Sequence, residues 1–169
     1  ANRGIWGADM VKLLQKLLEE GLMDRQGLLK EPYFTKGIRI GDVLVTKEAV
    51  RAVQLAKGAI AAGIEILTES YGIRFSDISK VVLAGGFGYY LDPKAAAAIG
   101  LLPKELTDRT VTGGNTALSG AALVGNRMLT GQLRAWDDLR RWHELQIQIL
   151  NLAEQVKFTE TFLKKMDFC

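Results

Sequence analysis

The sequence predicts an α/β fold with a mixed sheet flanked by helices, and two patterns support this. An apolar run, Val81-Val82-Leu83-Ala84, has the composition of a buried strand and ends at Gly85-Gly86-Phe87-Gly88. Residues 47–70 before this run and 116–129 after it have the apolar spacing of helices. A strand that ends in glycines is a common way for an α/β protein to expose main-chain N–H groups to a nucleotide. A tight turn that only packs is the alternative.

Length and composition place the chain among ordinary soluble proteins. At 169 residues it forms one domain or two small lobes, and 48% apolar and 24% charged residues are typical of such proteins. A net charge of +3 is too small to indicate a nucleic-acid partner or an anionic membrane. No apolar run approaches the ~20 residues of a membrane span. No signal peptide is visible, so we expect a cytoplasmic protein.

The residue types that carry most metal and nucleophilic chemistry are scarce. The single cysteine, Cys169, excludes an internal disulfide framework and an iron–sulfur cluster held by this chain alone. We expect its thiol to be inert. The single histidine, His143, lies among charged residues, and a lone exposed helical histidine is neither a metal site nor part of a catalytic dyad. No catalytic or metal-ligating residue is therefore assigned.

The first third of the chain predicts a helix and a hairpin. Met10–Glu20 places apolar side chains on one helical face, and Gly21 ends the segment. Apolar residues then alternate from Ile38 to Val45 around Gly41-Asp42, which predicts a short hairpin.

The next helix is expected from Lys47 to Ser70, with Thr46 as its N-cap. One face is apolar and another consists of small residues. The apolar face holds Val50, Val53, Ile60, Ile64 and Leu67, and the small face holds Ala52, Ala56, Ala59 and Gly63. Gly58 and Gly63 each cost about 1 kcal/mol relative to alanine in a helix, so another backbone is expected close by. That neighbour is either the sheet or, on the functional interpretation, a nucleotide or a partner helix.

The middle of the chain predicts two strands separated by a short helix. Lys80–Ala84 is expected to be a strand buried on both faces, because its apolar run is continuous. Asp92-Pro93 then provides a cap and a first-turn proline for a short helix, Lys94–Ile99. A second short strand, Arg109–Thr112, leads into Gly113-Gly114-Asn115.

The last third is expected to be mainly helical. Thr116–Leu129 repeats the small-residue stripe of the long helix, at Ala117, Ala121 and Gly125. Arg134–His143 predicts a charged surface helix, and Gln146–Leu152 alternates as an edge strand would. Thr159–Met166 predicts a closing helix.

Several segments in a fixed order carry a family resemblance. They are Leu55–Leu67, Leu83–Gly88 with Leu91-Asp92, Ile99–Pro103, Gly114-Asn115 with Ala117-Leu118 and Gly120-Ala121, and Phe158–Phe162 with Met166–Phe168. Together they resemble the C-terminal domain of the reductive activators of corrinoid proteins, within the superfamily of actin, sugar kinases and heat-shock ATPases. The similarity covers about residues 5–168.

The resemblance implies the C-terminal lobe of an actin-like (ribonuclease H-like) ATPase domain. We expect one lobe over residues 1–169, with a helix and hairpin region at 1–45, a nucleotide-cleft core at 46–132 and a closing region at 133–169. The implied function is the nucleotide-binding half of an ATP-dependent activator, which restores a cobalt(II) corrinoid protein to cobalt(I) for methyl transfer. The implied partner is the corrinoid protein of a methyltransferase system.

The same resemblance implies which parts lie outside these residues. Family members carry an iron–sulfur domain and an amino-terminal lobe with a phosphate loop upstream, so we expect this chain to be a C-terminal portion. Alone it should bind ATP or ADP with Mg²⁺ weakly and turn over little or no ATP. Gly4–Asp9 lies where relatives have a glycine-rich turn, and the bulky Trp6 argues against phosphate contact there.

The resemblance also implies contact residues for the nucleotide. Gly85, Gly86, Phe87 and Gly88 are the first candidates, the glycines by close backbone approach and Phe87 by covering the base or sugar. Gln54 and Lys57 lie one helical turn apart and are candidates for adenine contacts; a solvated or snorkelling lysine is the alternative for Lys57. Gly114 and Asn115 are further candidates, although capping of the next helix is the simpler role. Asp92 is best explained as a cap.

Two other functions stay open. One is an interaction or homodimerisation module that keeps the fold and has lost nucleotide binding, favoured by Trp6 and by the small-residue helix faces. The other is half of a small-molecule kinase, for which no substrate-binding signature is visible. Nucleotide binding separates the first of these from the activator.

Overall fold

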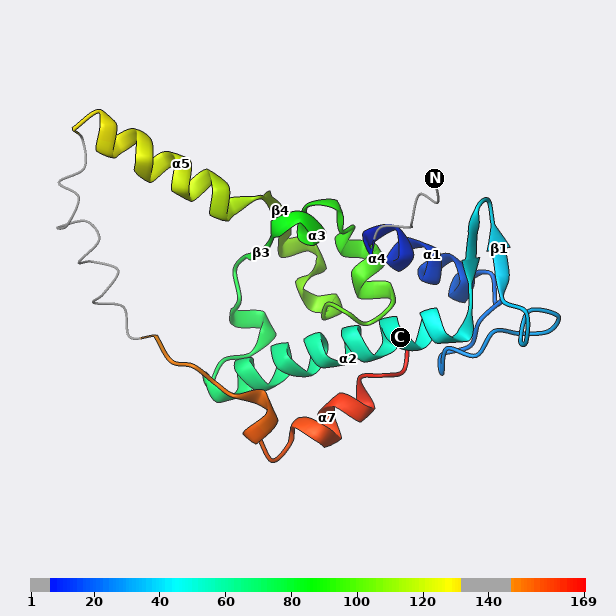
Figure 1. Cartoon of the computed structure of the whole chain (residues 1–169). Coiled ribbons are helices and arrows are strands. Elements are labelled where there is room, and N and C mark those ends of the chain that lie inside the picture. The colour runs from blue at the N-terminus through cyan, green and yellow to red at the C-terminus, as the bar shows by residue number, and fades with distance from the viewer. Residues whose placement is uncertain (1–6, 132–146) are drawn as a thin grey trace.

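The computed structural model describes residues 7–131 and 147–169. Its elements alternate between helices and short strands, so the predicted α/β class is confirmed. The described strands form two separate pairs, one antiparallel and one parallel. A 24-residue helix, α2 (Lys47–Ser70), runs through the middle of the molecule, with other helices on both of its sides (Figure 1).

The amino-terminal predictions hold closely. Helix α1 spans Gly7–Glu19, and Gly21 follows it with a φ of +66°. Strands β1 (Ile38–Ile40) and β2 (Val43–Val45) form the expected antiparallel hairpin. Thr46 caps α2, because its side-chain oxygen accepts a hydrogen bond from the main-chain N–H of Ala49 at 3.3 Å.

Close neighbours of the α2 glycines are present, although they are not the expected sheet: Gly58 faces the C-terminal helix and Gly63 faces Leu152, while Ala52 and Ala56 of the predicted small face are exposed. Helix α7 (Phe158–Lys164) lies along α2 (Figure 1). A Cβ on Gly58 would lie 3.3 Å from Met166 Cγ and 3.4 Å from Phe162 Cε2, so glycine permits this close approach. The predicted apolar face of α2 is partly wrong, because Ile60 is 45% exposed and Leu67 is 52% exposed. Elements from distant parts of the chain, and not periodicity alone, decide which side of α2 is buried.

The parallel strands β3 (Val81–Ala84) and β4 (Thr110–Gly114) pair directly with each other. They are connected by α3 (Gly85–Tyr90), α4 (Pro93–Ala98) and the 3₁₀ helix η2 (Lys104–Arg109). The expectation that β3 is buried on both faces is wrong, since Val82 is 50% exposed. In the described part of the chain β3 pairs with β4 alone, so one face and one edge stay open.

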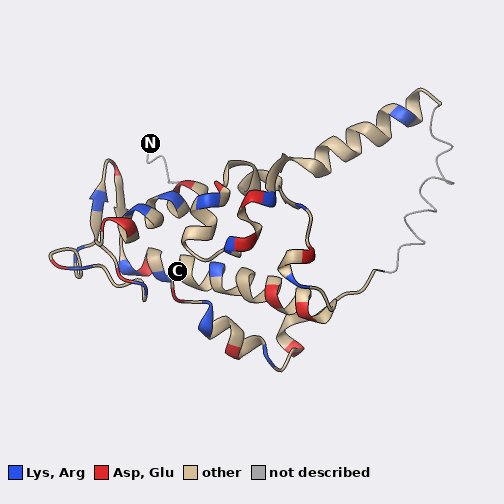
Figure 2. Ribbon diagram, turned by 180° about the vertical axis from the view of Figure 1, so that it is seen from behind, with Lys and Arg blue, Asp and Glu red and all other residues tan. Residues whose placement is uncertain are grey.

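Helix α5 spans Thr116–Leu129, as predicted. It extends away from the other described elements, and none of its residues is buried (Figure 1). Figure 2 shows it almost free of charge, with Arg127 as its one charged side chain. The small stripe at Ala117, Ala121 and Gly125 therefore meets no neighbour among the described residues.

The carboxyl-terminal predictions hold in part. The expected helix Arg134–His143 lies outside the described residues. The expected edge strand is wrong from residue 147 onward, where the chain is irregular up to the 3₁₀ helix η3 (Leu152–Glu154). Ile149 is 93% exposed, because no strand of the described chain lies beside this segment to pair with it.

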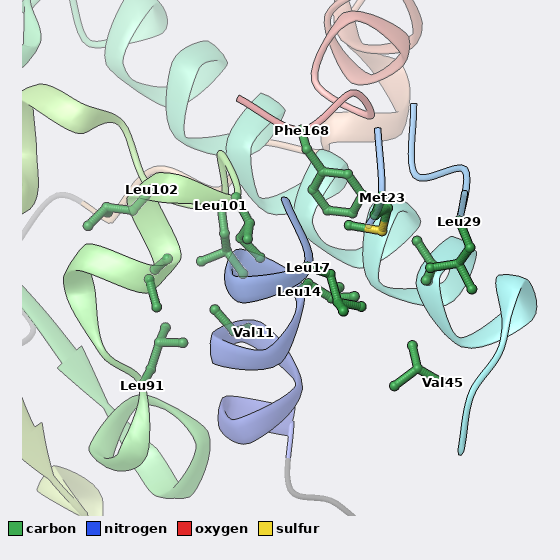
Figure 3. Close-up of a cluster of buried hydrophobic side chains, with 14 of the residues drawn as sticks. Val11, Leu14, Leu17, Met23, Leu29, Val45, Leu91, Leu101, Leu102 and Phe168 are labelled. Carbon is green, nitrogen blue, oxygen red and sulfur yellow. The ribbon is translucent and has the colours of Figure 1, made fainter. Parts of the chain in front are cut away.

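The main core lies where α1, α4, the hairpin and the C-terminal tail meet. Figure 3 shows Val11, Leu14 and Leu17 of α1 between Leu91, Leu101 and Leu102 on one side and Phe168 with Met23 on the other. Phe168 is 1% exposed, so the tail is part of the core. No helix within the described ranges is long and apolar enough to cross a membrane.

Candidate functional site

Two glycine turns lie next to each other at the carboxyl end of the β3–β4 strand pair. Ala84 at the end of β3 pairs with Gly114 at the end of β4. Because the strands are parallel, the turn that begins at Gly85 and the turn that ends at Asn115 both lie at the carboxyl end of the strand pair (Figure 1). Ligands of open α/β sheets bind outside the carboxyl ends of the strands, where these two turns lie.

The main chain of the first turn is uncovered. Gly85 has a φ of +81°, which an L side chain rarely adopts. A Cβ built on Gly85 or on Gly86 would meet no atom within 4 Å. Gly88 differs, because a Cβ there would lie 2.9 Å from the carbonyl carbon of Leu83. Gly88 lets α3 pack back onto β3, and Gly85-Gly86 leaves room for a ligand.

Aromatic side chains border the uncovered main chain. Phe87 is 47% exposed, and one edge of its ring lies 3.1 Å from the position of a Cβ on Gly7, at the start of α1. Tyr89 is 54% exposed, and its ring lies 3.7 Å from the position of a Cβ on Gly114. An apolar, partly exposed rim of this kind suits a flat ring that lies over the glycines.

Two further predicted caps are confirmed. The side-chain oxygen of Asn115 accepts from the N–H of Leu118 at 3.1 Å and so begins α5. Asp92 accepts from the N–H of Lys94 at 2.9 Å and so begins α4. Both side chains thus have a structural function that needs no ligand.

Lys57 lies in a different place and is not the solvated lysine of the alternative interpretation. It is 1% exposed, and its ammonium donates a hydrogen bond to the carbonyl of Asp167. The ammonium also lies 5.2 Å from the centre of the Phe168 ring. Burial lowers the pKa of Lys57 to about 8; nearby Cys169 and Asp167 favour the charged form, and Lys165 opposes it.

Gln54 belongs to the same arrangement. It is 3% exposed, and its Nε2 donates to the carbonyl of Gln26 at 2.9 Å and to that of Met166 at 3.4 Å. Two residues after Met166, the carbonyl of Phe168 accepts a hydrogen bond from Arg25 Nε at 3.1 Å. Three side chains therefore hold three successive carbonyls of the tail. Sequence reasoning missed this set, since only the one-turn spacing of Gln54 and Lys57 pointed to a shared role.

The structure does not bring Gln54 and Lys57 together with the glycine turns. The first residue of α1, Gly7, faces Phe87, whereas Gln26 follows the other end of α1 and binds Gln54. The hydrogen bonds of Gln54 and Lys57 within the described chain go to residues 26, 166 and 167, and none goes to residues 85–88.

Other chemical groups are sparse in the described part of the chain. Residues 7–131 and 147–169 contain no group of three metal-ligating side chains. His143 and Trp6 lie outside the described ranges. Cys169 is exposed, and its sulfur lies 2.8 Å from the position of a Cβ on Gly100.

Comparison with known proteins decides the family. A family model described as the C-terminal domain of RACo, the ASKHA domain, matches residues 1–169. The chain belongs to this family. The predicted resemblance to reductive activators of corrinoid proteins is thereby confirmed, and so is the ASKHA-type fold.

Two relatives of this ASKHA domain show how much of a longer protein it spans. The corrinoid activation enzyme RamQ of Eubacterium limosum is 36% identical, over 73% of this chain and 25% of RamQ. A solved structure, the reductive activator for corrinoid, iron-sulfur protein, is 26% identical with a TM-score of 0.77. That match covers 98% of this chain and 28% of the solved chain. The chain thus spans about a quarter of the length of each relative.

Proposed function

We propose that this chain is the nucleotide-binding lobe of an ATP-dependent reductive activator. On this proposal the whole protein returns a cobalt(II) corrinoid protein of a methyltransferase system to cobalt(I) in the cytoplasm. The names of the two relatives support the role in corrinoid activation. The uncovered main chain of Gly85 and Gly86, at the carboxyl end of a parallel strand, supports the nucleotide.

The proposed contacts follow from the geometry at that end of the strand pair. Adenosine lies against the main chain of Gly85-Gly86, where no side chain intervenes. The exposed ring of Phe87 covers the base or sugar. The turn at Gly114-Asn115 lies beside it, at the same carboxyl end of the strand pair. Gln54, Lys57 and Gly88 are not included, because packing and hydrogen bonds to the protein already account for them. Mg²⁺ enters with the phosphates of the nucleotide.

The contribution of this lobe to activation is conformational. A ligand shifts an equilibrium only by its differential affinity for two states. ATP at the glycine turns would therefore favour one complex with the corrinoid protein over another. On this proposal an iron–sulfur domain outside these residues would supply the electron that reduces cobalt(II) to cobalt(I).

Substitution of Gly86 tests the proposal. Gly86→Ala adds a methyl group where the isolated chain has open space, so the fold should be retained. The methyl group should obstruct adenosine and weaken ADP binding at least about tenfold in calorimetric titration. Gly120→Ala on α5 is the matched control, because a Cβ there also meets nothing within 4 Å. Absence of ADP binding by the wild-type chain at millimolar nucleotide, or equal binding by both variants, contradicts the proposal.

An interaction module with the same fold is the second candidate, and one observation favours it. Helix α5 has no buried residue, and Leu118 and Leu129 are 65% and 90% exposed. Homodimerisation through this helix predicts a concentration-dependent mass in sedimentation equilibrium. Leu118→Gln should abolish that dependence and leave ADP binding unchanged.

A further inference from the structure

A second pocket opens on the side of α2 that carries Gln54. It has a volume of about 560 Å³ and lies between the loop at residues 26–28 and the first two turns of α2. Binding pockets for small molecules have volumes of about 300–1,000 Å³ and are mostly apolar with a few fixed polar groups. Leu28, Ala52 and Leu55 supply apolar walls, and Leu28 and Leu55 are 53% and 44% exposed.

The polar group at the inner end of this pocket is fixed in orientation. Both partners of the Gln54 amide nitrogen are carbonyl oxygens, those of Gln26 and Met166, so the nitrogen must face them. Gly27 has no side chain that could press on the amide, and a Cβ there would lie only 2.9 Å from its Cδ. A reversed amide would place its oxygen against two carbonyl oxygens, so the nitrogen stays toward them and Oε1 is the atom left to face the pocket.

That oxygen has an unused capacity to accept a hydrogen bond. Among the described residues no group donates a hydrogen bond to Gln54 Oε1, although the side chain belongs to a residue that is only 3% exposed. No described side-chain atom is both sealed from solvent and without a partner, so Oε1 is accessible to solvent, and Gln54 is one of the residues that line the pocket. A ligand with an N–H or O–H group satisfies it.

The rim of the pocket offers a second polar contact. Lys47 and Glu48 lie 3.9 Å apart as an ion pair. Arg51, one turn along α2, has no ion-pair partner in the part of the chain that the structure describes. Its planar guanidinium matches a carboxylate with two parallel hydrogen bonds.

We propose that this pocket binds a small apolar carboxylate that also carries one N–H or O–H donor. The donor bonds Gln54 Oε1, the apolar part lies against Leu28 and Leu55, and the carboxylate bonds Arg51. The site is separate from the glycine turns and does not depend on nucleotide binding there.

Indole-3-acetate is a probe with all three features, and 1-methylindole-3-acetate is its match without the N–H donor. Titration of the whole chain, followed by the NMR signals of the Gln54 side-chain amide, should give a Kd of about 1 mM for the first probe. The methylated probe should bind at least about fivefold more weakly, and so should indole-3-acetate to Arg51→Gln. Lys80→Gln, an exposed lysine outside the pocket, is the control and should bind as the wild type does.

Three outcomes of the titrations overturn the proposal, and a fourth concerns where the probe binds. The three are unchanged Gln54 signals at about ten times the expected Kd, equal affinity for the two probes, and full affinity in Arg51→Gln. Shifts confined to the residues around Gly85 would also overturn it, because they would place the probe at the other site. ADP binding measured on the same samples keeps this result distinct from the nucleotide proposal.

Discussion

The buried ammonium of Lys57 makes a specific prediction about pH and stability. Burial lowers its pKa from 10.5 to about 8 in the folded chain, whereas the unfolded chain keeps the ordinary value. Between these pH values the unfolded state binds more protons, so stability rises as the pH rises. The cost of the buried charge is complete below about pH 8 and disappears above about pH 10.5.

The size of the effect follows from the same pKa. One pKa unit is worth about 1.4 kcal/mol, so the full contribution of Lys57 is about 3 kcal/mol. Asp167, Cys169 and the ring of Phe168 favour the ammonium, and Lys165 opposes it. Their sum is smaller than the effect of burial, because the pKa of Lys57 is still lowered.

Urea unfolding followed by far-ultraviolet circular dichroism measures this contribution. Lys57→Met keeps the apolar stem and removes the titrating group. The unfolding free energy of this variant should therefore not show the increase with pH that Lys57 causes in the wild type. The wild-type chain should gain about 3 kcal/mol relative to this variant between pH 8 and pH 10.5. The unbonded carbonyl of Asp167 costs the variant a constant amount and cancels from the pH dependence.

A difference between two chains removes the titration of every other group. Lys80→Met changes an exposed lysine and should follow the wild-type profile. A constant difference between wild type and Lys57→Met across this pH range would refute the assignment of a costly buried ammonium. A difference that shrinks with rising pH would show that the ammonium stabilises the fold.

Two further substitutions test the core and a helix end. Phe168→Ala should lose about 3–5 kcal/mol of unfolding free energy in urea titrations, because the ring is 1% exposed within the core; a loss below about 1 kcal/mol would show that the tail is not part of the core. Asp92→Ala should lose about 1 kcal/mol, since two N–H groups of α4 lose their acceptor. Asp92→Asn should retain most of that energy, and equal losses in both would indicate a role other than capping.

Local patterns predicted the elements of this fold well. The bounds of α2 and α5, the hairpin, and the caps Thr46, Asp92 and Asn115 depend on residues within a few positions of each other. Helix periodicity and capping are interactions of this short range, so the sequence contains them directly.

Burial was predicted less well, because it depends on distant segments. Lys57 is buried by a tail 110 residues further along the chain, and no local pattern announces that contact. Residues 147–152 alternate like a strand, but a strand also needs a neighbour to pair with. Val82 is exposed for the same kind of reason, since an apolar run does not reveal how many strands lie beside it.

Contacts and backbone conformation within the described chain account for most of its glycines, but not for all of them. Most described glycines either have a positive φ, as Gly85 does, or leave room for a close neighbour, as Gly58 does. Gly86, Gly120 and Gly125 do neither, and each lies in a helix. A glycine inside a helix costs about 1 kcal/mol relative to alanine, and here no described contact offsets that cost. All three lie on the glycine turn or on α5, which are among the surfaces that the described chain leaves uncovered. A nucleotide at Gly86 and a close-packed neighbour along α5 would each supply the missing reason.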